Sequence, residues 1–294
     1  MDSVVTQVFL PIALGVVMLG LGLSLTVGDF ARVVRYPRAV AIALGCQVLL
    51  LPAICFGLVV AFGLRPELAV GMMLLAASPG GTTANLYSHL FGGHVALNVT
   101  LTAVNSVLAV FTLPIVVNLS LSHFMTGSGD VGLRFDEVLK VFAIVLVPVA
   151  IGMLVRAKAA DLAARLTKPV RILSVVVLVL VIAGAVAREL DNVVDYFVAV
   201  GLVALLFNLI SLAVGYGLPK LATVGERESV ASAMEIGIHN GTLAIAIAVG
   251  LLDSTEMAIP AAVYSLIMFF TAAGFGWLIT RNRVPEPVVA APEA

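Results

Sequence analysis

Charged residues are scarce in this sequence, and so is cysteine. Only 11% of its 294 residues are Asp, Glu, Lys or Arg, whereas a soluble domain needs roughly a quarter to cover its surface. Hydrophobic residues make up 61% of the chain, and the mean hydropathy is +1.15. These proportions exclude an ordinary soluble domain, because most of the outer surface must face lipid. The net charge of −1 also argues against a nucleic-acid partner.

The two cysteines, Cys46 and Cys55, lie nine residues apart in one apolar segment. On a straight helix this spacing separates them by about 13 Å, which is too far for a disulfide. We therefore interpret both as buried packing residues. The chain also lacks the dense carboxylate and imidazole clusters of a transition-metal site, and it lacks the repeated charged rings of a channel pore.

Long apolar segments fill the rest of the chain. With a span length of about 20 residues, the sequence divides into nine segments, which predicts an all-α integral membrane protein with nine transmembrane helices. They lie near 8–28, 40–62, 68–91, 95–119, 137–157, 170–188, 194–217, 229–252 and 258–280. The connections are too short for a soluble domain, and the Pro- and Ala-rich tail, 281–294, is predicted to be a disordered cytoplasmic segment.

The distribution of basic residues supports this number of spans. With the N-terminus outside and the C-terminus in the cytoplasm, twelve of the 16 Lys and Arg lie on the inner side. The inner set is Arg32, Arg35, Arg38, Arg156, Lys158, Arg165, Lys168, Arg171, Lys220, Arg227, Arg281 and Arg283, and the outer set is Arg65, Arg134, Lys140 and Arg188. We therefore expect a multi-pass protein of the cell membrane, and "MDSVVTQ" lacks the cationic start of a cleaved signal peptide.

Two of the predicted spans contain polar interruptions near their middle. The third carries "SPGGTTAN" at 78–85, and the eighth carries "EIGIHNGT" at 235–242. A simple Pro- or Gly-induced kink is the alternative for either one taken alone. An unwound stretch in lipid is tolerated only where it is packed in protein or lines a cavity. There its freed carbonyls can hold a cation, and its half-helix N-termini can face an anion.

The two interrupted spans are expected to run in opposite directions, because five crossings separate them. Such a pair is typical of the inverted repeats of secondary transporters, whose sites lie where broken helices meet at the midplane. The sequence thus predicts a first repeat at about 8–119, lacking one helix, and a second at about 137–280. If the missing first helix of the first repeat is counted, the break falls in the fourth of five helices in both repeats.

Glu235 is the acidic residue that lies deepest inside a predicted span. An intramembrane carboxylate marks a functional site by default, and no Lys or Arg lies mid-span to neutralise it. Asn98, Thr102 and Asn105 share one face of the fourth span, where they can offer oxygens to an ion or form interhelical hydrogen bonds. Few formal charges among hard oxygen donors favour an alkali cation.

At this point the motifs resemble those of the bile acid:sodium symporter family, in its nine-helix form. The resemblance is carried by "SPGGTTANLYSHLFGGHVALNVTLTAVNS" and "EIGIHNGTLAIAIA", and it extends to "GLGLSLTVGDF" and "CQVLLLPAICF". It implies a panel domain and a core domain, with two broken helices crossing in the core. It also implies two sodium ions behind the crossing and an organic-anion substrate on its other side.

Carried over by position, the resemblance assigns a role to twelve residues. The first sodium site would contain Asn85, Asn98, Thr102, Glu235 and the backbone at Ala84. The second would contain Gln47, Glu235, the carbonyls of Ile236 and Ile238, and the side chain of His239. The substrate would bind near Thr82, Thr83 and Asn240.

Three positions depart from the family pattern. Ala84 replaces a hydroxyl residue, Asn98 replaces a serine, and His239 stands where the family usually has glutamine. An imidazole offers no oxygen, and a protonated one repels a nearby cation. We therefore hypothesise that the second site is weakened, or that a proton partly replaces one sodium.

The resulting hypothesis is a sodium-coupled symporter of an organic anion such as a bile acid, pantoate or a keto acid. The alternative is a proton-coupled or sodium-independent carrier of the same fold. A membrane enzyme is disfavoured. Glu235 and His239 at i and i+4 could form an acid–base pair, but no metal motif or activated nucleophile accompanies them.

Overall fold

The computed structural model describes residues 25–125, 135–170 and 193–281, with scattered positions in 15–23 and 172–176. Within these ranges all regular structure is helical, apart from one isolated β-bridge. The predicted spans 8–28 and 170–188 lie largely outside the described residues. Four helices are long and apolar enough to cross a membrane, namely Pro37–Ala61, Val95–Phe124, Phe197–Leu221 and Glu256–Thr280. They agree with the predicted spans 40–62, 95–119, 194–217 and 258–280.

Two of these four spans are assembled from more than one helical segment. The first combines α4 (Pro37–Gly45), the π-helical turn η3 (Cys46–Leu50) and α5 (Leu51–Ala61). The others are α8 (Val95–Phe124), α11 (Val193–Leu221), and the 3₁₀ turn η4 (Glu256–Ala258) continued by α14 (Ile259–Thr280). The short helix α3 (Val27–Ala31) and the 3₁₀ turn η2 (Arg32–Arg35) precede α4, and α9 (Phe135–Lys158) covers the predicted span 137–157.

The predicted spans 68–91 and 229–252 are each broken, as the sequence indicated. The former consists of α6 (Pro66–Ala77) and α7 (Thr83–Leu90), and the latter of α12 (Glu226–Gly237) and α13 (Gly241–Gly250). Pro79 cannot donate a helical hydrogen bond, and glycine residues flank both breaks, so each helix ends where the sequence stops favouring it. Each of these two predicted spans therefore consists of two half-helices and not of one continuous helix.

The two broken helices begin with the same local structure. Before α6, Leu64 N donates to Val59 O over 3.1 Å and Gly63 has φ 59°. Before α12, Val224 N donates to Pro219 O over 2.9 Å and Thr223 also has φ 59°. Both are helix C-terminal turns of the same type. α6 and α12 then each run for 12 residues before they break.

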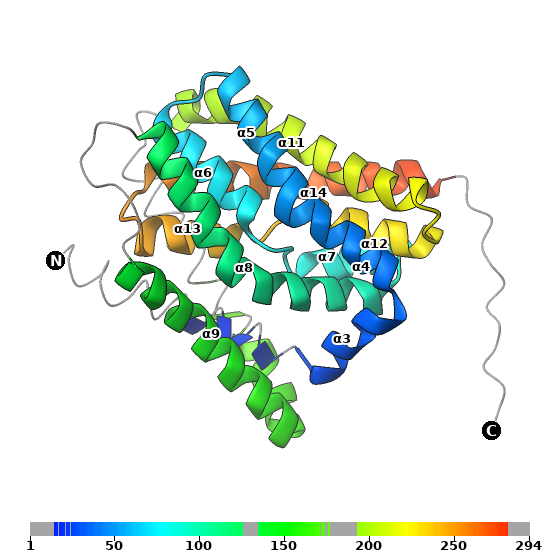
Figure 1. The fold of residues 1–294 in the computed structure, drawn as a ribbon. Coiled ribbons are helices and arrows are strands. Elements are labelled where there is room, and N and C mark those ends of the chain that lie inside the picture. Colours follow the sequence, from blue (N-terminus) through cyan, green and yellow to red (C-terminus); the bar gives the residue numbers. More distant parts are fainter. Residues whose placement is uncertain are drawn as a thin grey trace, which may run out of the picture.

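Figure 1 shows α4, α5, α11, α12 and α14 on one side of α8, and α9 on the other. The close approach of α9 to the N-terminal segment depends on glycine. A Cβ at Gly152 would lie 2.6 Å from Leu19 O and 2.7 Å from Gly22 C. Two backbones meet directly at this point, as small residues allow in membrane bundles.

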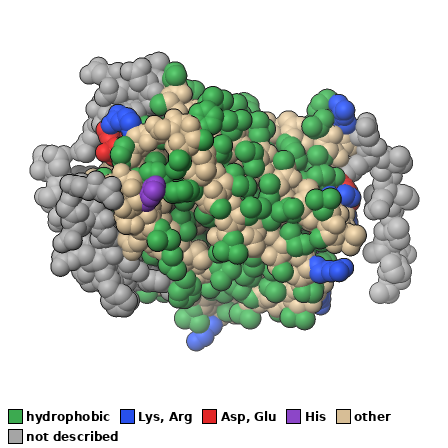
Figure 2. Space-filling model, turned by 45° about the horizontal axis from the view of Figure 1, so that its top comes forward, with side chains coloured by type: hydrophobic (Ala, Val, Ile, Leu, Met, Phe, Trp, Pro, Cys, Tyr) green, Lys and Arg blue, Asp and Glu red, His purple; other side chains and the backbone are tan. Residues whose placement is uncertain are grey.

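The outer surface is apolar, as expected for a protein in lipid. Figure 2 shows hydrophobic side chains spread across the face in view, with Lys and Arg near its margins. Large apolar side chains such as Leu119, Val198 and Phe270 are exposed. Both cysteines are free and buried, which confirms their predicted packing role. Contact with lipid explains the apolar surface. It does not explain the polar residues that are buried inside the bundle.

Candidate functional site

The two breaks are joined to each other by backbone hydrogen bonds. Gly81 N donates to Ile238 O over 2.7 Å, and Asn240 N donates to Pro79 O over 2.8 Å. These bonds form the antiparallel bridge between Gly80 and His239. Each break thus satisfies backbone groups of the other, which is how an unwound stretch is accommodated away from water.

The Glu235 carboxylate lies directly behind this bridge, in the last turn of α12. It is buried, and a Cβ placed on Gly80 would overlap it. Only a residue without a side chain leaves room for the carboxylate here. Thr102 Oγ1 donates to Glu235 Oε2 over 2.6 Å, and Asn98 Nδ2 lies 3.4 Å from the same oxygen. Three of the predicted first-site residues are therefore together.

Six buried side-chain oxygens make no hydrogen bond within the described residues. They are Glu235 Oε1, Asn98 Oδ1, Asn85 Oδ1, Gln47 Oε1, Ser88 Oγ and Ser232 Oγ. The Asn98 amide is held by its nitrogen, which donates to Ala231 O over 2.8 Å. A buried oxygen without a partner is costly. The first four belong to residues that the family resemblance assigned to sodium, whereas Ser88 and Ser232 were not predicted to belong to the site.

Asn85 and Asn105 differ in their surroundings. Asn85 lies in the first turn of α7, where its Nδ2 is 3.4 Å from Thr82 O. Asn105 is buried on α8, and its Nδ2 has no partner in the described chain. Ala84 is buried beside Asn85, and its amide donates to Gly81 O over 2.9 Å.

Gln47 enters the site from the π-helical turn between α4 and α5. Its Nε2 donates to Ser78 O over 3.0 Å and lies 3.3 Å from Ala76 O. It therefore satisfies carbonyls that become free where α6 ends. A π-turn shifts the helical register, and such turns are frequent at functional sites. The sequence predicted Gln47 at the second site but gave no signal for this turn.

His239 is buried among aromatic rings. Its ring stacks on Phe207, with centroids 5.6 Å apart and planes at 23°, and meets the Tyr264 ring edge-on at 5.4 Å. Nδ1 lies 3.3 Å from Ser78 O and 3.4 Å from Gln47 Nε2. Gln47 Nε2 already donates to Ser78 O, so the tautomer that completes the set has Nδ1 donating to this carbonyl. Nε2 has no partner among the described residues.

The two carbonyls predicted at the second site differ. Ile238 O accepts the bridging bond from Gly81 N, whereas Ile236 O receives no donor in the described part of the chain. Ile236 is the second-last residue of α12, where carbonyls lose their helical partners. One carbonyl is thus free and the other keeps a single lone pair.

The residues predicted to meet substrate lie at the starts of the second half-helices. Thr82 is the exposed N-cap residue of α7, and Thr83 follows it, half-buried. Asn240 is the half-buried N-cap residue of α13, and its Oδ1 accepts from Leu243 N over 3.0 Å. This bond uses the amide oxygen, which leaves the side-chain NH₂ of Asn240 as a donor.

Comparison with known proteins identifies the family. The sequence matches the Sodium Bile acid symporter family over residues 11–196. The chain belongs to this family. It is 30% identical over 258 residues to the "Uncharacterized sodium-dependent transporter YocS" of Bacillus subtilis, covering 88% of this chain and 78% of that protein. The match to a family of transporters makes this protein a transporter rather than an enzyme.

Plant and animal relatives are more distant. The "Probable sodium/metabolite cotransporter BASS2, chloroplastic" of Oryza sativa subsp. japonica is 26% identical over 92% of this chain, which spans 64% of that protein. The human "Ileal sodium/bile acid cotransporter" is 25% identical over 82% of this chain and 69% of its own length. The names of all three relatives specify sodium, whereas a bile acid is named only for the human protein and a metabolite only for the rice protein.

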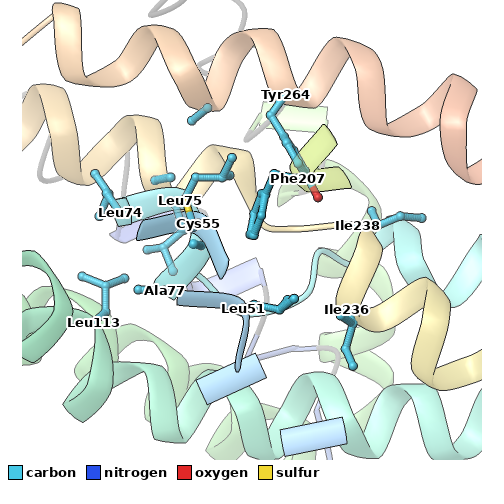
Figure 3. Close-up of a cluster of buried hydrophobic side chains, with 14 of the residues drawn as sticks. Leu51, Cys55, Leu74, Leu75, Ala77, Leu113, Phe207, Ile236, Ile238 and Tyr264 are labelled. Atoms are coloured by element: carbon cyan, nitrogen blue, oxygen red, sulfur yellow. The ribbon is translucent and has the colours of Figure 1, made fainter. Parts of the chain in front are cut away.

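In this symporter-family member, one set of polar contacts at the crossing was not predicted from the sequence. Asn208 on α11 and Tyr264 on α14 are both buried, and both bind the carbonyl of Gly237 at the end of α12. Figure 3 shows Tyr264 beside Phe207, near the chain that leads to Ile238. Both are isolated polar residues in apolar spans, as is Gln47, but the family resemblance that selected Gln47 assigned them no role.

Proposed function

We propose that this protein is a sodium-coupled symporter of an organic anion. The observation that carries the proposal is the buried Glu235 carboxylate, which has one oxygen without a partner and no basic side chain bound to it among the described residues. A buried anion is stable only when something neutralises it. A cation that binds reversibly can neutralise the carboxylate and still be released during the transport cycle.

The donor set around Glu235 favours a monovalent ion. One carboxylate is joined by the neutral oxygens of Asn85, Asn98 and Thr102, so a bound Na⁺ leaves the site close to neutral. Ca²⁺ and Mg²⁺ sites use more carboxylates or retained waters. Transition metals prefer imidazole and thiolate clusters, and the described residues hold no group of three or more His, Cys, Asp or Glu that could form one. We assign these residues, with the backbone at Ala84, to the first sodium site.

A second, weaker sodium site is proposed beside Gln47. Its oxygen donors are Gln47 Oε1, the Ile236 and Ile238 carbonyls and Glu235. His239 contributes a nitrogen in place of an oxygen, and Na⁺ binds oxygen in preference to nitrogen. We therefore expect this site to be occupied poorly, so that transport depends mainly on the first ion.

The substrate is proposed to bind on the other side of the crossing, where α7 and α13 begin. Helix N-termini carry partial positive charge and free N–H groups, and both favour a carboxylate. Thr82, Thr83 and the NH₂ of Asn240 add side-chain donors at the same positions. The substrate class is therefore an organic anion, such as a bile acid, pantoate or a keto acid.

The architecture proposed for transport is an inverted repeat. The first repeat is 8–119 and the second 137–280, in nine spans divided between a panel and a core domain. The matching turns before α6 and α12, and their equal lengths, support this division. The N-terminus lies outside the cell membrane, and the tail 281–294 lies in the cytoplasm.

Coupling follows from the shared use of the crossing. Sodium at Glu235 binds on one side of the bridge between the two breaks. The N-termini of α7 and α13 present hydrogen-bond donors to the substrate on the other side. An ion that neutralises Glu235 stabilises the crossing in the geometry that binds the anion, and it shifts the population toward that state. The substrate then gains affinity without contacting the ion.

Uptake into proteoliposomes tests the proposal. Purified protein is reconstituted with an inward gradient of Na⁺, or of K⁺ or choline at equal ionic strength, and accumulation of radiolabelled pantoate, pyruvate and taurocholate is measured. Accumulation above equilibrium under the Na⁺ gradient alone is expected. Uptake driven by a pH gradient without Na⁺ would support a proton-coupled carrier, and equilibration without accumulation would indicate a sodium-independent one.

A further inference from the structure

The carbonyl oxygen of Gly237 is held by two side chains from two different helices. Asn208 Nδ2 donates to it over 2.7 Å from α11, and Tyr264 Oη donates to it over 2.9 Å from α14. Asn208 Nδ2 also donates to Tyr264 Oη over 2.8 Å. The three groups form a closed triangle at the residue where α12 ends.

Every polar atom of this triangle is engaged. The two N–H bonds of Asn208 go to Gly237 O and Tyr264 Oη, and its Oδ1 accepts from Thr271 Oγ1. The Gly237 carbonyl uses both lone pairs. A fully satisfied buried network of this kind fixes one geometry, because every alternative leaves a buried group unpaired. Gly237 itself packs on Leu212, and a Cβ there would overlap that side chain.

The first break has a similar contact with one difference. There Gln47 Nε2 donates to Ser78 O just after α6, as Asn208 Nδ2 donates to Gly237 O at the end of α12. Gln47 Oε1, however, has no partner in the described chain, whereas the Asn208 oxygen is bound by Thr271. One amide keeps an oxygen for a ligand, and the other is committed to holding the backbone.

We propose that Asn208 and Tyr264 are positioning residues for cation binding, which rests on the sodium site proposed above. By binding the Gly237 carbonyl they fix the last turn of α12. Glu235 and Ile236 lie in this turn, so the carboxylate and the free Ile236 carbonyl stay aimed at the ion. Neither Asn208 nor Tyr264 contacts the ion itself. Loss of the contact removes no ligand, but it lets the end of α12 move, and with it the Glu235 carboxylate and the Ile236 carbonyl.

Sodium-dependent thermal stabilisation of the purified full-length protein tests this role. The unfolding midpoint is measured against NaCl concentration, with choline chloride holding the ionic strength constant, for the parent and for Tyr264→Phe. This substitution removes one hydroxyl and keeps the ring. We expect the sodium concentration for half-maximal stabilisation to rise about three- to tenfold, because Gly237 O loses one of its two buried hydrogen bonds.

The matched control is Tyr216→Phe. Tyr216 Oη donates to Glu226 over 2.8 Å at the start of α12, far along the helix from Gly237. Its sodium midpoint should equal that of the parent. A merely structural role for Tyr264 would lower the unfolding temperature in choline and leave the sodium midpoint unchanged, and that result would overturn the proposal. An equal shift in Tyr216→Phe would overturn it too.

A second variant separates failure of this inference from failure of the proposed function. Asn208→Leu keeps the side-chain size and removes both N–H donors, and its shift should not add to that of Tyr264→Phe in the double variant, because both act on one carbonyl. Additive shifts contradict the shared role. If the parent itself shows no stabilisation by sodium over choline, the sodium site is wrong, whatever the variants do.

Discussion

Thr102 Oγ1 donates to Glu235 Oε2 over 2.6 Å, and the second carboxylate oxygen, Oε1, has no partner in the described chain. One side of the carboxylate is therefore fixed by the protein and the other is left for a ligand. This arrangement orients the charge on Glu235 without neutralising it.

Removing the charge of Glu235 should abolish coupling. In Glu235→Gln the amide keeps the shape and the contact with Thr102, but it cannot neutralise Na⁺. We expect sodium-driven accumulation to fall about 100-fold, in line with the loss of a charge-assisted contact. Proteoliposome uptake measures this effect. Unchanged sodium dependence in this variant would mean that the ion binds elsewhere.

The Thr102 hydroxyl should tune the affinity for sodium. Thr102→Val is nearly isosteric and removes both the donor to Glu235 and a proposed oxygen ligand, so the half-saturating sodium concentration should rise about five- to tenfold. Thr100→Val is the control, because the Thr100 hydroxyl bonds to Ala96 O in its own helix. Equal effects of the two substitutions would show that α8 stability, and not the ion, is responsible.

A side chain at Gly80 should disable the crossing. A Cβ at this position overlaps the Glu235 carboxylate, so Gly80→Ala must displace either the bridge or the acid. We expect more than about tenfold loss of sodium-dependent uptake, as strain at a packed site commonly costs 1–3 kcal/mol. Gly57→Ala provides the comparison, since a Cβ there meets no atom within 4 Å. Normal transport by Gly80→Ala would argue against the carboxylate position described.

An oxygen in place of the His239 imidazole should strengthen the second site. His239→Gln supplies a carbonyl oxygen beside Gln47, and we expect the sodium dependence of uptake to steepen from a Hill slope of about one toward two. Uptake rates over a sodium series measure this slope. A parent slope near two, independent of pH, would show that the imidazole does not weaken the site.

Much of the fold follows from the length of apolar segments, which sequence records directly. The spans 95–119 and 258–280 correspond to Val95–Phe124 and Glu256–Thr280 because a helix must cover the bilayer whatever it packs against. The breaks were equally readable, since Pro79 and the glycines around them disfavour helix. The charge pattern gave an orientation that stays a prediction.

The contacts within the site were less accessible to sequence analysis. Glu235, Asn98 and Thr102 were found because polar residues in an apolar span are conspicuous. The donation from Asn208 and Tyr264 to Gly237 was not, because it depends on which faces of α11, α12 and α14 meet. Likewise, the orientation of the Gln47 side chain depends on the π-helical turn Cys46–Leu50, which was not predicted from the sequence.

The backbone bridge between Gly81 and Ile238, and between Asn240 and Pro79, has a consequence for how the protein can move. Separating the two unwound segments would leave four backbone groups without partners in a medium that offers none. Release of cargo by pulling these segments apart is therefore unfavourable. The joined segments should instead travel as one rigid piece, and access to either side of the membrane should alternate through sliding of the neighbouring helices against it.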